Sequence, residues 1–294
     1  MKIGFVGLGQ MGRHMAANML KSGAELIVSD IRADVLPFFE KQGAKASTVL
    51  KDVAAADIIF LSLPESEAVR GVLLGDNGLL NELREGQIVV DTSTINYSAT
   101  LEIYRELLER GIEFLDAPVS GMESRAKDGT LTVMCGGGEE TFRKVEPYLK
   151  FIATKILYMG RSGSGQLTKL INQLLFDMNV AALAEILPLS VKMGLDPEMV
   201  GEVVNSGTGK SYASEFFIPR ILKNDFTEGY ALKNAYKDLV SAAEISANLH
   251  VPLPVLGAAT STYQMALLKG YGAQNKGAMI RFFEELLGVE YRKK

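Results

Sequence analysis

Short apolar runs alternate with helical patterns along the first 160 residues of the chain. The runs are rich in β-branched residues, and the segments between them repeat their apolar positions with the period of a helix. Strands this apolar need cover on both faces, and helices that join successive strands supply it while keeping the strands parallel. The pattern predicts a doubly wound α/β sheet, with strands at 3–6, 26–29, 58–61, 88–90, 114–116, 131–134 and 156–158.

The pattern changes after Gly160, where Arg161-Ser162-Gly163-Ser164-Gly165 forms a polar, glycine-rich joint and the following chain is almost entirely helical in period. Residues 166–193 predict a helix of roughly 40 Å, long enough to join two domains, and Pro188 favours a kink in its last turns. We expect an α/β domain over residues 1–162 and an all-α domain over residues 163–294. Further helices are predicted at 197–205, 232–249, 254–268 and 276–287.

Length and composition are those of a folded, two-domain protein. The chain has 294 residues, of which 47% are hydrophobic and 22% charged. A net charge of −4 without a basic run argues against a nucleic-acid partner. Glu185 and Pro188 interrupt an apolar stretch that would otherwise favour a membrane span. We therefore expect neither a nucleic-acid nor a membrane partner.

The cysteine content and the N-terminus favour the cytoplasm. Cys135 is the only cysteine, which excludes an intrachain disulfide and a cysteine-based zinc site, so no metal is expected. Residues 1–7 lead directly into the first strand pattern and leave no room for a cleaved leader peptide. We expect a soluble, cytoplasmic protein.

A glycine-rich loop follows the first predicted strand and opens a helical pattern. In Gly7-Leu8-Gly9-Gln10-Met11-Gly12, the first glycine allows a tight turn, the second lets the backbone approach a pyrophosphate, and the third lets the helix pack on the strand. Free N–H groups at the helix N-terminus would face the phosphates. In this context the motif predicts a dinucleotide-binding domain of the Rossmann type, although a simple glycine turn is the alternative.

Asp30 closes the second strand about 20 residues further on. There a carboxylate would accept hydrogen bonds from the adenosine ribose hydroxyls and repel a 2′-phosphate, which favours NAD over NADP. Two alternatives stay open: Asp30 caps a helix, or Arg32 reaches a phosphate.

Hydride transfer to a carbonyl leaves an alkoxide that must receive a proton, so such an enzyme needs a positioned acid or base. His14 and His250 occupy positions at which a structural role is the better interpretation. Burial lowers the pKa of a lysine ammonium, which makes a buried lysine the natural substitute. Lys169 lies near the start of the long predicted helix, with Asn172 and Gln173 on the same face, and a solvated lysine on an amphipathic helix is the alternative.

A second polar cluster, Asp116-Ala117-Pro118-Val119-Ser120-Gly121-Met122, follows a strand of the first domain. Ligands of open α/β sheets bind outside the carboxyl ends of the strands. Ser120 and the N–H groups after it would hold a carboxylate there, unless the segment is only a turn.

Taken together, these motifs resemble the β-hydroxyacid dehydrogenase family, and the resemblance runs essentially end to end. It is carried, in order, by Gly7 to Gly12 with Met15-Ala16-Ala17-Asn18, by Asp116 to Gly121, by Gly165-Gln166-Leu167-Thr168-Lys169-Leu170-Ile171-Asn172, and by Lys237-Asp238-Leu239.

The resemblance implies a role for each of these segments. Lys169 would be the catalytic acid/base, Asn172 would orient the substrate, and Ser120 with Gly121 would bind its carboxylate. Asp238 would help to arrange Lys169. The cofactor-binding residues implied by the motifs are Gly7, Leu8, Gly9, Gln10, Met11, Gly12, Asp30, Arg32, Leu63, Pro64, Thr94 and Lys237.

The chain departs from the family pattern at Met122, where many members carry a second glycine, and this predicts a bulkier pocket floor. Residues 205–212 correspond to a family segment on the far side of the substrate pocket, which implicates Tyr212, while Phe216 also affects how the cleft is filled. Lys210 in this segment is a candidate for binding a second anionic group, and a solvated loop lysine is the alternative.

The sequence therefore predicts an NAD-preferring oxidoreductase that interconverts a short 3-hydroxy acid and its semialdehyde or oxo acid, with a small carboxylate-bearing molecule as its partner. The family resemblance implies a homodimer or homotetramer joined through the helical domain. Two alternatives remain: an imine reductase, which usually carries aspartate or tyrosine in place of Lys169, and a nucleotide-dependent binding module without catalysis.

Overall fold

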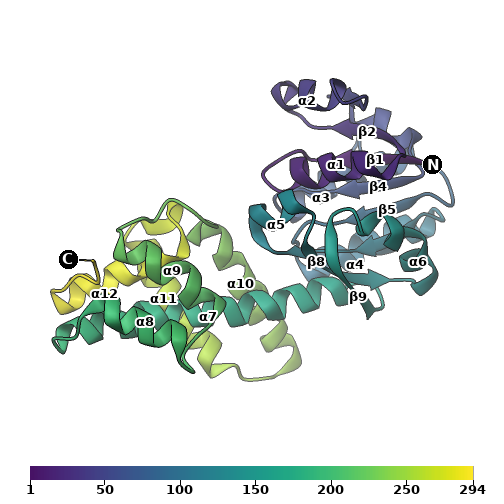
Figure 1. The fold of residues 1–294 in the computed structure, drawn as a ribbon. Coiled ribbons are helices and arrows are strands. Elements are labelled where there is room, and N and C mark those ends of the chain that lie inside the picture. The colour runs from purple at the N-terminus through teal and green to yellow at the C-terminus, as the bar shows by residue number, and fades with distance from the viewer. Residues whose placement is uncertain (294) are drawn as a thin grey trace. The chain divides into compact units, whose positions relative to one another are not determined.

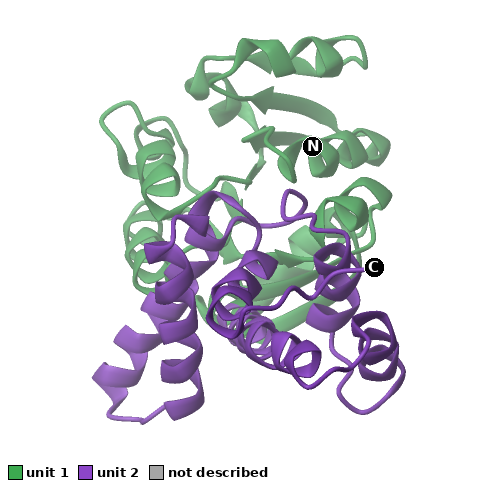
Figure 2. Cartoon of the chain, turned by 90° about the vertical axis from the view of Figure 1, so that its left-hand side faces the viewer, with its two compact units in different colours: residues 1–169 green, residues 170–294 purple. Residues whose placement is uncertain are grey.

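The computed structural model describes residues 1–293, and the chain divides into two compact units. Unit 1 spans residues 1–169 and unit 2 begins at Leu170, as the two colours of Figure 2 show. Unit 1 holds the sheet with its covering helices, and unit 2 is helical (Figure 1). The predicted fold class, a doubly wound α/β unit followed by an all-α unit, is confirmed.

The sheet of unit 1 has nine strands in the order β3-β2-β1-β4-β5-β6-β8-β7, with β9 paired to β8. Strands β1 to β6 are all parallel, and the order reverses at β1, as in doubly wound folds. The carboxyl ends of these strands therefore meet at one edge. The strands are β1 (Lys2–Val6), β2 (Glu25–Ser29), β3 (Lys45–Ser47), β4 (Ile58–Leu61), β5 (Ile88–Asp91), β6 (Glu113–Asp116), β7 (Val119–Ser120), β8 (Leu131–Gly137) and β9 (Ala153–Gly160).

The prediction of parallel connections throughout is wrong at β8, which runs antiparallel to both β6 and β7. A parallel return needs a crossover of a dozen or more residues. Only residues 121–130 separate β7 from β8, and they hold the short helix α5 (Met122–Asp128). The chain therefore comes back in the opposite direction. Strands β3 and β7 were not predicted, because three and two residues are too few to show a period.

Both faces of the sheet are covered, as the apolar strands require. Alternate residues of one strand enter different cores: Phe5 and Phe60 pack in one cluster, and Val6 and Leu61 in the other. The covering helices are α1 (Gly12–Met19), α2 (Pro37–Glu40), α3 (Ser66–Leu74), α4 (Tyr97–Glu109) and α6 (Glu139–Leu149), with short 3-10 helices at η1 (Leu20–Ser22), η2 (Ala33–Val35), η3 (Leu50–Ala55) and η4 (Leu79–Asn81).

Helix α7 (Ser164–Lys192) begins within the glycine-rich joint and continues into unit 2 without interruption, with Pro188 inside it. Its residues from Val180 to Leu187 on one side contribute to the unit 2 core. By length and composition alone α7 would also suffice to cross a membrane, since its most apolar window has a mean hydropathy of 1.6 and is 39% buried. A core helix of a soluble protein passes the same test.

Unit 2 packs its helices around a core that includes Phe217, Leu239 and Tyr263. Helices α10 and α11 have the predicted bounds. Helix α9 was not predicted, because a glycine-rich stretch precedes it and Pro219 lies within it. The helix predicted at 276–287 is divided into a 3-10 turn and a short α-helix. The elements are α8 (Pro197–Ser206), α9 (Tyr212–Leu222), α10 (Leu232–Leu249), α11 (Pro254–Leu268), η5 (Tyr271–Ala273), η6 (Lys276–Met279) and α12 (Ile280–Leu287).

Candidate active site

The glycine loop between β1 and α1 has the geometry that its three glycines predict. Gly7 has a φ of +91°, and a Cβ there would lie 2.3 Å from the Ser62 carbonyl oxygen. A Cβ on Gly12 would lie 1.9 Å from the Gly7 carbonyl oxygen, so α1 can approach the end of β1 this closely only because Gly12 has no side chain. A Cβ on Gly9 would meet nothing within 4 Å. That open space is where a pyrophosphate would approach the backbone, so the loop fits a dinucleotide.

Asp30, at the end of β2, is tied to the same loop. Its Oδ2 accepts a hydrogen bond of 2.7 Å from the Leu8 backbone N–H, and its Oδ1 accepts one of 2.9 Å from the Arg32 backbone N–H. The Arg32 guanidinium reaches the Leu8 carbonyl at 3.3 Å and lies 3.5 Å from the Asp30 carboxylate. Asp30 is therefore fixed beside the glycine loop, with the Arg32 cation next to it.

A chain of contacts runs from the glycine loop to helix α7. Leu63 packs against Gly7, and its backbone N–H donates to Ser93 Oγ at 2.9 Å. The Ser93 carbonyl accepts a hydrogen bond of 2.7 Å from Gln166 Nε2, and Gln166 Oε1 accepts one of 3.3 Å from the Ile95 backbone. Gln166 lies one turn before Lys169 on α7. The loops after β4 and β5 therefore hold the first turn of that helix, and Thr94 lies between two of the bonded residues.

The Asp116 carboxylate, at the end of β6, receives the N-terminal N–H groups of α7. Its Oδ1 accepts from the Gly163 N–H at 2.7 Å and its Oδ2 from the Gln166 N–H at 2.9 Å. Burial raises the pKa of Asp116 to about 6, although these backbone hydrogen bonds oppose the shift. A carboxylate at a helix N-terminus is also favoured by the helix dipole. Asp116 thus fastens α7 to the sheet.

Lys169 follows directly after this anchored turn. It is 7% exposed and lies on α7, three residues beyond Gln166 and on the same face. The alternative of a solvated lysine is wrong, because the side chain is buried.

Ser120 ends β7 and leads into a turn of two residues with positive φ. Gly121 has a φ of +143° and Met122 a φ of +61°. Met122 thus occupies a left-handed conformation that glycine adopts at little cost and other residues avoid, which explains why a glycine would suit the same position. Glu123, the next residue, hydrogen-bonds to Gln10 in the glycine loop at 2.7 Å. The predicted carboxylate-binding turn and the glycine loop are therefore linked.

Four predicted site residues and the further candidate Lys210 lie in unit 2. Asn172 is exposed on α7, and its amide lies 3.4 Å from Gln173 Oε1. Tyr212 opens α9 and contacts Phe176 and Phe216, with ring centroids 5.7 and 6.4 Å apart respectively. On α10, Lys237 is half-buried and Asp238 is 6% exposed. Lys210 is exposed and pairs with Glu215 at 2.7 Å.

The two histidines occupy structural positions. His14 Nε2 lies 3.0 Å from a Glu123 carboxylate oxygen. His250 ends α10 in the left-handed conformation, with a φ of 56°, as its position in the sequence predicts. His14 is thereby tied to the neighbourhood of the glycine loop.

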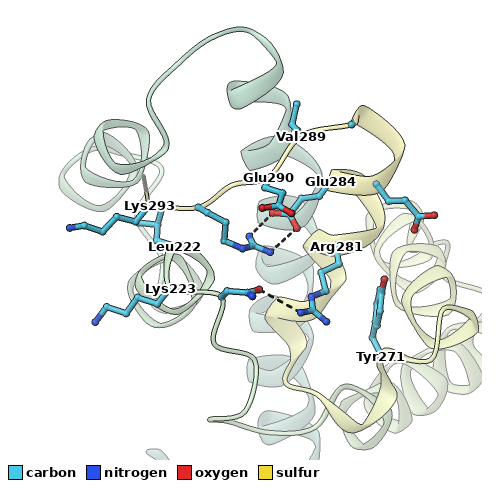
Figure 3. A pocket seen from close by; sticks show the side chains of 12 residues that line it. Leu222, Lys223, Tyr271, Arg281, Glu284, Val289, Glu290 and Lys293 are labelled. Atoms are coloured by element: carbon cyan, nitrogen blue, oxygen red, sulfur yellow. Dashed lines mark hydrogen bonds and ion pairs between the residues drawn. The ribbon is translucent and has the colours of Figure 1, made fainter.

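A shallow groove of about 1060 Å³ lies near the C-terminal end of unit 2 (Figure 3). Arg292 bridges to Glu284 there at 2.6 and 2.9 Å and fastens the last residues to α12. None of the predicted site residues is in its lining. The lining residues are Leu222, Lys223, Asn224, Tyr271, Arg281, Glu284, Glu285, Gly288, Val289, Glu290, Arg292 and Lys293.

No role was predicted for Ser93, Gln166 or Glu123, and none for Asp116 as an anchor. Gln166 and Asp116 were visible as parts of motifs, and their bonds to α7 follow from tertiary structure alone. The 2% exposure of Gln166 is known only from the structure, so the sequence offered no signal beyond the place of this residue in the motif.

Comparison with known proteins supports the dehydrogenase interpretation over the two alternatives. Residues 2–160 match the family model for the NAD-binding domain of 6-phosphogluconate dehydrogenase, and residues 163–283 match the NAD-binding domain of NADP-dependent 3-hydroxyisobutyrate dehydrogenase. The 2-(hydroxymethyl)glutarate dehydrogenase of Eubacterium barkeri is 40% identical, over 98% of this chain and 96% of its own. The mitochondrial 3-hydroxyisobutyrate dehydrogenase of Rattus norvegicus is 32% identical, over 96% and 87%.

The similarity to 3-hydroxyisobutyrate dehydrogenases extends to a solved structure. The 3-hydroxyisobutyrate dehydrogenase of Salmonella typhimurium superimposes with a TM-score of 0.87 at 29% identity and covers 96% of this chain and 99% of its own. With the glycine loop fitted to a dinucleotide and relatives aligned along nearly the whole length, the chain belongs to the β-hydroxyacid dehydrogenase family and is an oxidoreductase that acts on CH–OH donors with a nicotinamide cofactor.

Proposed function

We propose that the substrate is a primary alcohol of the form HOCH₂–CH(R)–COO⁻, which is interconverted with its semialdehyde. Support comes from the names of two relatives, because 3-hydroxyisobutyrate and 2-(hydroxymethyl)glutarate share this unit and differ only in R. R is a methyl group in the first and a carboxyethyl group in the second. The common carboxylate would be bound by Ser120 and the backbone N–H groups that follow it, at the end of β7.

The proposed acid/base is Lys169, and its burial on an anchored helix turn is the observation that carries the proposal. A bound nicotinamide supplies the hydride acceptor or donor. In the oxidative direction the neutral Lys169 Nζ takes the hydroxyl proton while the carbinol C–H bond breaks. In reduction the Lys169 ammonium gives a proton to the carbonyl oxygen. Asn172 would orient the substrate, and Asp238 would arrange the amine.

Two substitutions at Lys169 test this role. Lys169→Ala should lower kcat by about 10²–10⁴-fold, the usual contribution of a general acid or base, while the Kd for NADH changes by less than about twofold. Lys169→Arg keeps the positive charge but cannot release a proton near neutral pH, so it should be equally inactive. Retained turnover in either variant would rule out proton transfer by this residue. Lys155→Ala, at an exposed position on β9, is the matched control.

The proposed cofactor preference is NAD over NADP, and it rests on the Asp30 carboxylate beside the glycine loop. A 2′-phosphate would meet this negative charge, whereas ribose hydroxyls would donate hydrogen bonds to it. The Arg32 cation would favour a 2′-phosphate. It does not reverse the preference, because it is already bound by Asp30 and the Leu8 carbonyl. Lys237, Leu63, Pro64 and Thr94 would complete the cofactor site.

A panel of substrates that differ only in the group R tests which R the enzyme prefers. Acids with R as hydrogen, methyl, hydroxymethyl and carboxyethyl should be assayed with NAD⁺ and NADP⁺ in parallel, and kcat/KM compared. By the family resemblance, Met122, Tyr212 and Phe216 would offer apolar surface for R. Lys210 is the candidate for a second carboxylate, although Glu215 already pairs with it. A preference for the dicarboxylate that Lys210→Ala removes would assign that lysine.

We also propose that the protein is a homodimer or homotetramer. Helix α7 leaves a stripe of apolar side chains exposed, which are Ile171, Leu175, Ile186 and Leu189. At 100° per residue they lie within about 60° of one another, on the side opposite the buried face. Exposed apolar stripes of this kind mark protein or membrane contacts.

A further inference from the structure

Glu123 joins the turn after β7 to the glycine loop, two segments 113 residues apart in the chain. Its Oε2 accepts a hydrogen bond of 2.7 Å from Gln10 Nε2, and its Oε1 accepts one from Arg13 and lies 3.0 Å from His14 Nε2. The hydrogen bonds from Gln10, His14 and Arg13 lower the pKa of Glu123 to about 2. The residue is therefore an anion at any pH at which the enzyme is assayed.

Helix α1 also binds the other end of α5. Asn18 Nδ2 donates to the Ala126 carbonyl at 3.0 Å and to the Lys127 carbonyl at 3.2 Å. Helix α5 is thus held to α1 at its first turn by Glu123 and at its last turn by Asn18. Of the two attachments, only Glu123 lies next to the strained residue Met122.

Met122 needs an external constraint to keep its conformation. Its φ of +61° is unfavourable for a residue with a Cβ, and such conformations persist only where the surroundings hold them. On one side Gly121 is confined, because a Cβ on it would lie 2.9 Å from Arg125 and 3.0 Å from Leu131. On the other side stands Glu123, with its three partners on the glycine loop and α1.

We propose that Glu123 is a positioning residue, whose carboxylate holds Met122 in the left-handed conformation and thereby places the Ser120–Gly121 turn for the substrate carboxylate. The inference rests on the proposed function, in which that turn binds the carboxylate. Glycine adopts the left-handed conformation without strain. A chain with glycine at position 122 would therefore not need this ionic contact, whereas the chain with Met122 does.

The first test separates substrate binding from turnover. Glu123→Ala should raise the KM for the hydroxy acid about tenfold, which is the size of coupling expected between contacting residues, while kcat and the Kd for NADH change by less than about twofold. Glu123→Gln keeps an acceptor for Gln10 and should recover part of the loss. Glu139→Ala is the control, since it removes an exposed carboxylate paired with Arg143 in the same unit. Melting temperatures show whether each variant folds.

The decisive test is a double-mutant cycle with Met122→Gly. Glycine removes the strain, so Glu123→Ala made in the Met122→Gly background should change KM by less than about twofold. An equal rise of KM in both backgrounds would overturn the inference, because Glu123 would then act independently of the Met122 conformation. An unchanged KM in Glu123→Ala alone would also overturn it.

Ser120→Ala distinguishes this failure from failure of the proposed function. If Ser120→Ala raises KM and Glu123→Ala does not, the carboxylate site stands and the anchor is wrong. If Ser120→Ala itself leaves KM unchanged, the carboxylate is bound elsewhere and both proposals fall.

Discussion

Three glycines of one loop are needed for different physical reasons, and the difference can be measured. A methyl group on Gly12 would lie 1.9 Å from a backbone carbonyl that cannot yield, whereas a methyl on Gly9 would enter open space. Gly12→Ala should therefore lower both the melting temperature and NADH affinity. Gly9→Ala should keep the melting temperature and weaken NADH binding by about tenfold or more, because the pyrophosphate loses its close approach.

Gly71→Ala is the control for this pair, since its Cβ would also meet nothing within 4 Å and it lies in helix α3, away from the loop. Thermal melting and NADH titration of the three variants give the readout. A stable, NADH-binding Gly12→Ala protein would contradict the packing argument.

The expected preference for NAD over NADP depends on a single carboxylate, that of Asp30. Asp30→Ser removes the negative charge that a 2′-phosphate would meet, so the ratio of kcat/KM with NADP⁺ to that with NAD⁺ should rise at least about tenfold. Because the Leu8 N–H loses its acceptor, both absolute values should fall. Asp34→Ser, at an exposed position on η2, is the control and should leave the ratio unchanged. An unaltered ratio in Asp30→Ser would remove the basis for the NAD preference.

Two buried carboxyl groups at neighbouring strand ends make stability depend on pH. Asp91 is paired in register with Asp116, and its Oδ2 has no hydrogen-bond partner within the described residues. Burial raises the pKa of Asp91 to about 7, and burial raises that of Asp116 to about 6. Between the usual carboxyl pKa near 4 and these values, the folded state binds more protons than the unfolded state.

The stabilisation from these two carboxyl groups is complete below about pH 4 and is lost as pH rises towards their folded-state pKa values of about 6 and 7. These two groups should therefore make the free energy of unfolding fall between about pH 4 and pH 7. Asp91→Asn cannot ionise, so its decline should be shallower, by up to about 1.4 kcal/mol per pH unit for one full proton. Urea unfolding at each pH is the measurement, and equal slopes in the two proteins would contradict the assignment.

At the scale of elements, α7 depends on polar anchors at its first turn. Gln166 joins the loop after β5 to the helix through Ser93 and Ile95, and Asp116 receives the helix N–H groups. Gln166→Ala leaves the buried Ile95 N–H without an acceptor, which costs about 1–3 kcal/mol. Because Lys169 follows one turn later, kcat should also fall, by about tenfold.

Thr168→Ala is the matched control for Gln166→Ala. Its hydroxyl only bonds back to the Ser164 carbonyl within the helix, so both kcat and stability should change little. Steady-state kinetics with urea unfolding would separate the two variants. A fully active Gln166→Ala enzyme would show that the anchor does not position Lys169.

The sequence predicted elements wherever an apolar period was long enough to read, and failed where it was not. The strands from β1 to β6 other than β3, and the helices α10 and α11, follow from apolar patterns of this kind. Strands β3 and β7 and helix α9 were too short or too rich in glycine and proline. The antiparallel direction of β8 could have been predicted only from the small number of residues that connect it to β7.

The residues of the glycine loop could be predicted from their spacing alone, because each glycine meets a steric requirement of its immediate surroundings. The Ser93–Gln166 and Glu123–Gln10 bonds join distant segments and leave no local pattern.

At the scale of the whole molecule, one face of α7 carries an apolar surface that a single chain leaves exposed to water. Ile171, Leu175 and Ile186 are 60, 57 and 60% exposed, and only 39% of the most apolar window of the helix is buried. A second copy of the chain would cover this stripe in a homodimer or homotetramer. A bilayer is the competing occupant, and it would need the polar residues on the other sides of α7 to enter lipid.

The double variant Leu175→Glu/Ile186→Glu tests which occupant is right. In a homo-oligomer these two carboxylates would face apolar surface, so the mass from size exclusion with light scattering should fall to that of a single chain of 31.9 kDa. Leu108→Glu, at a 55% exposed position on α4 in unit 1, should keep the assembled mass. A wild-type protein that is already monomeric at micromolar concentration would contradict the oligomer. A protein that pellets with vesicles until the double substitution releases it would instead assign the stripe to a membrane.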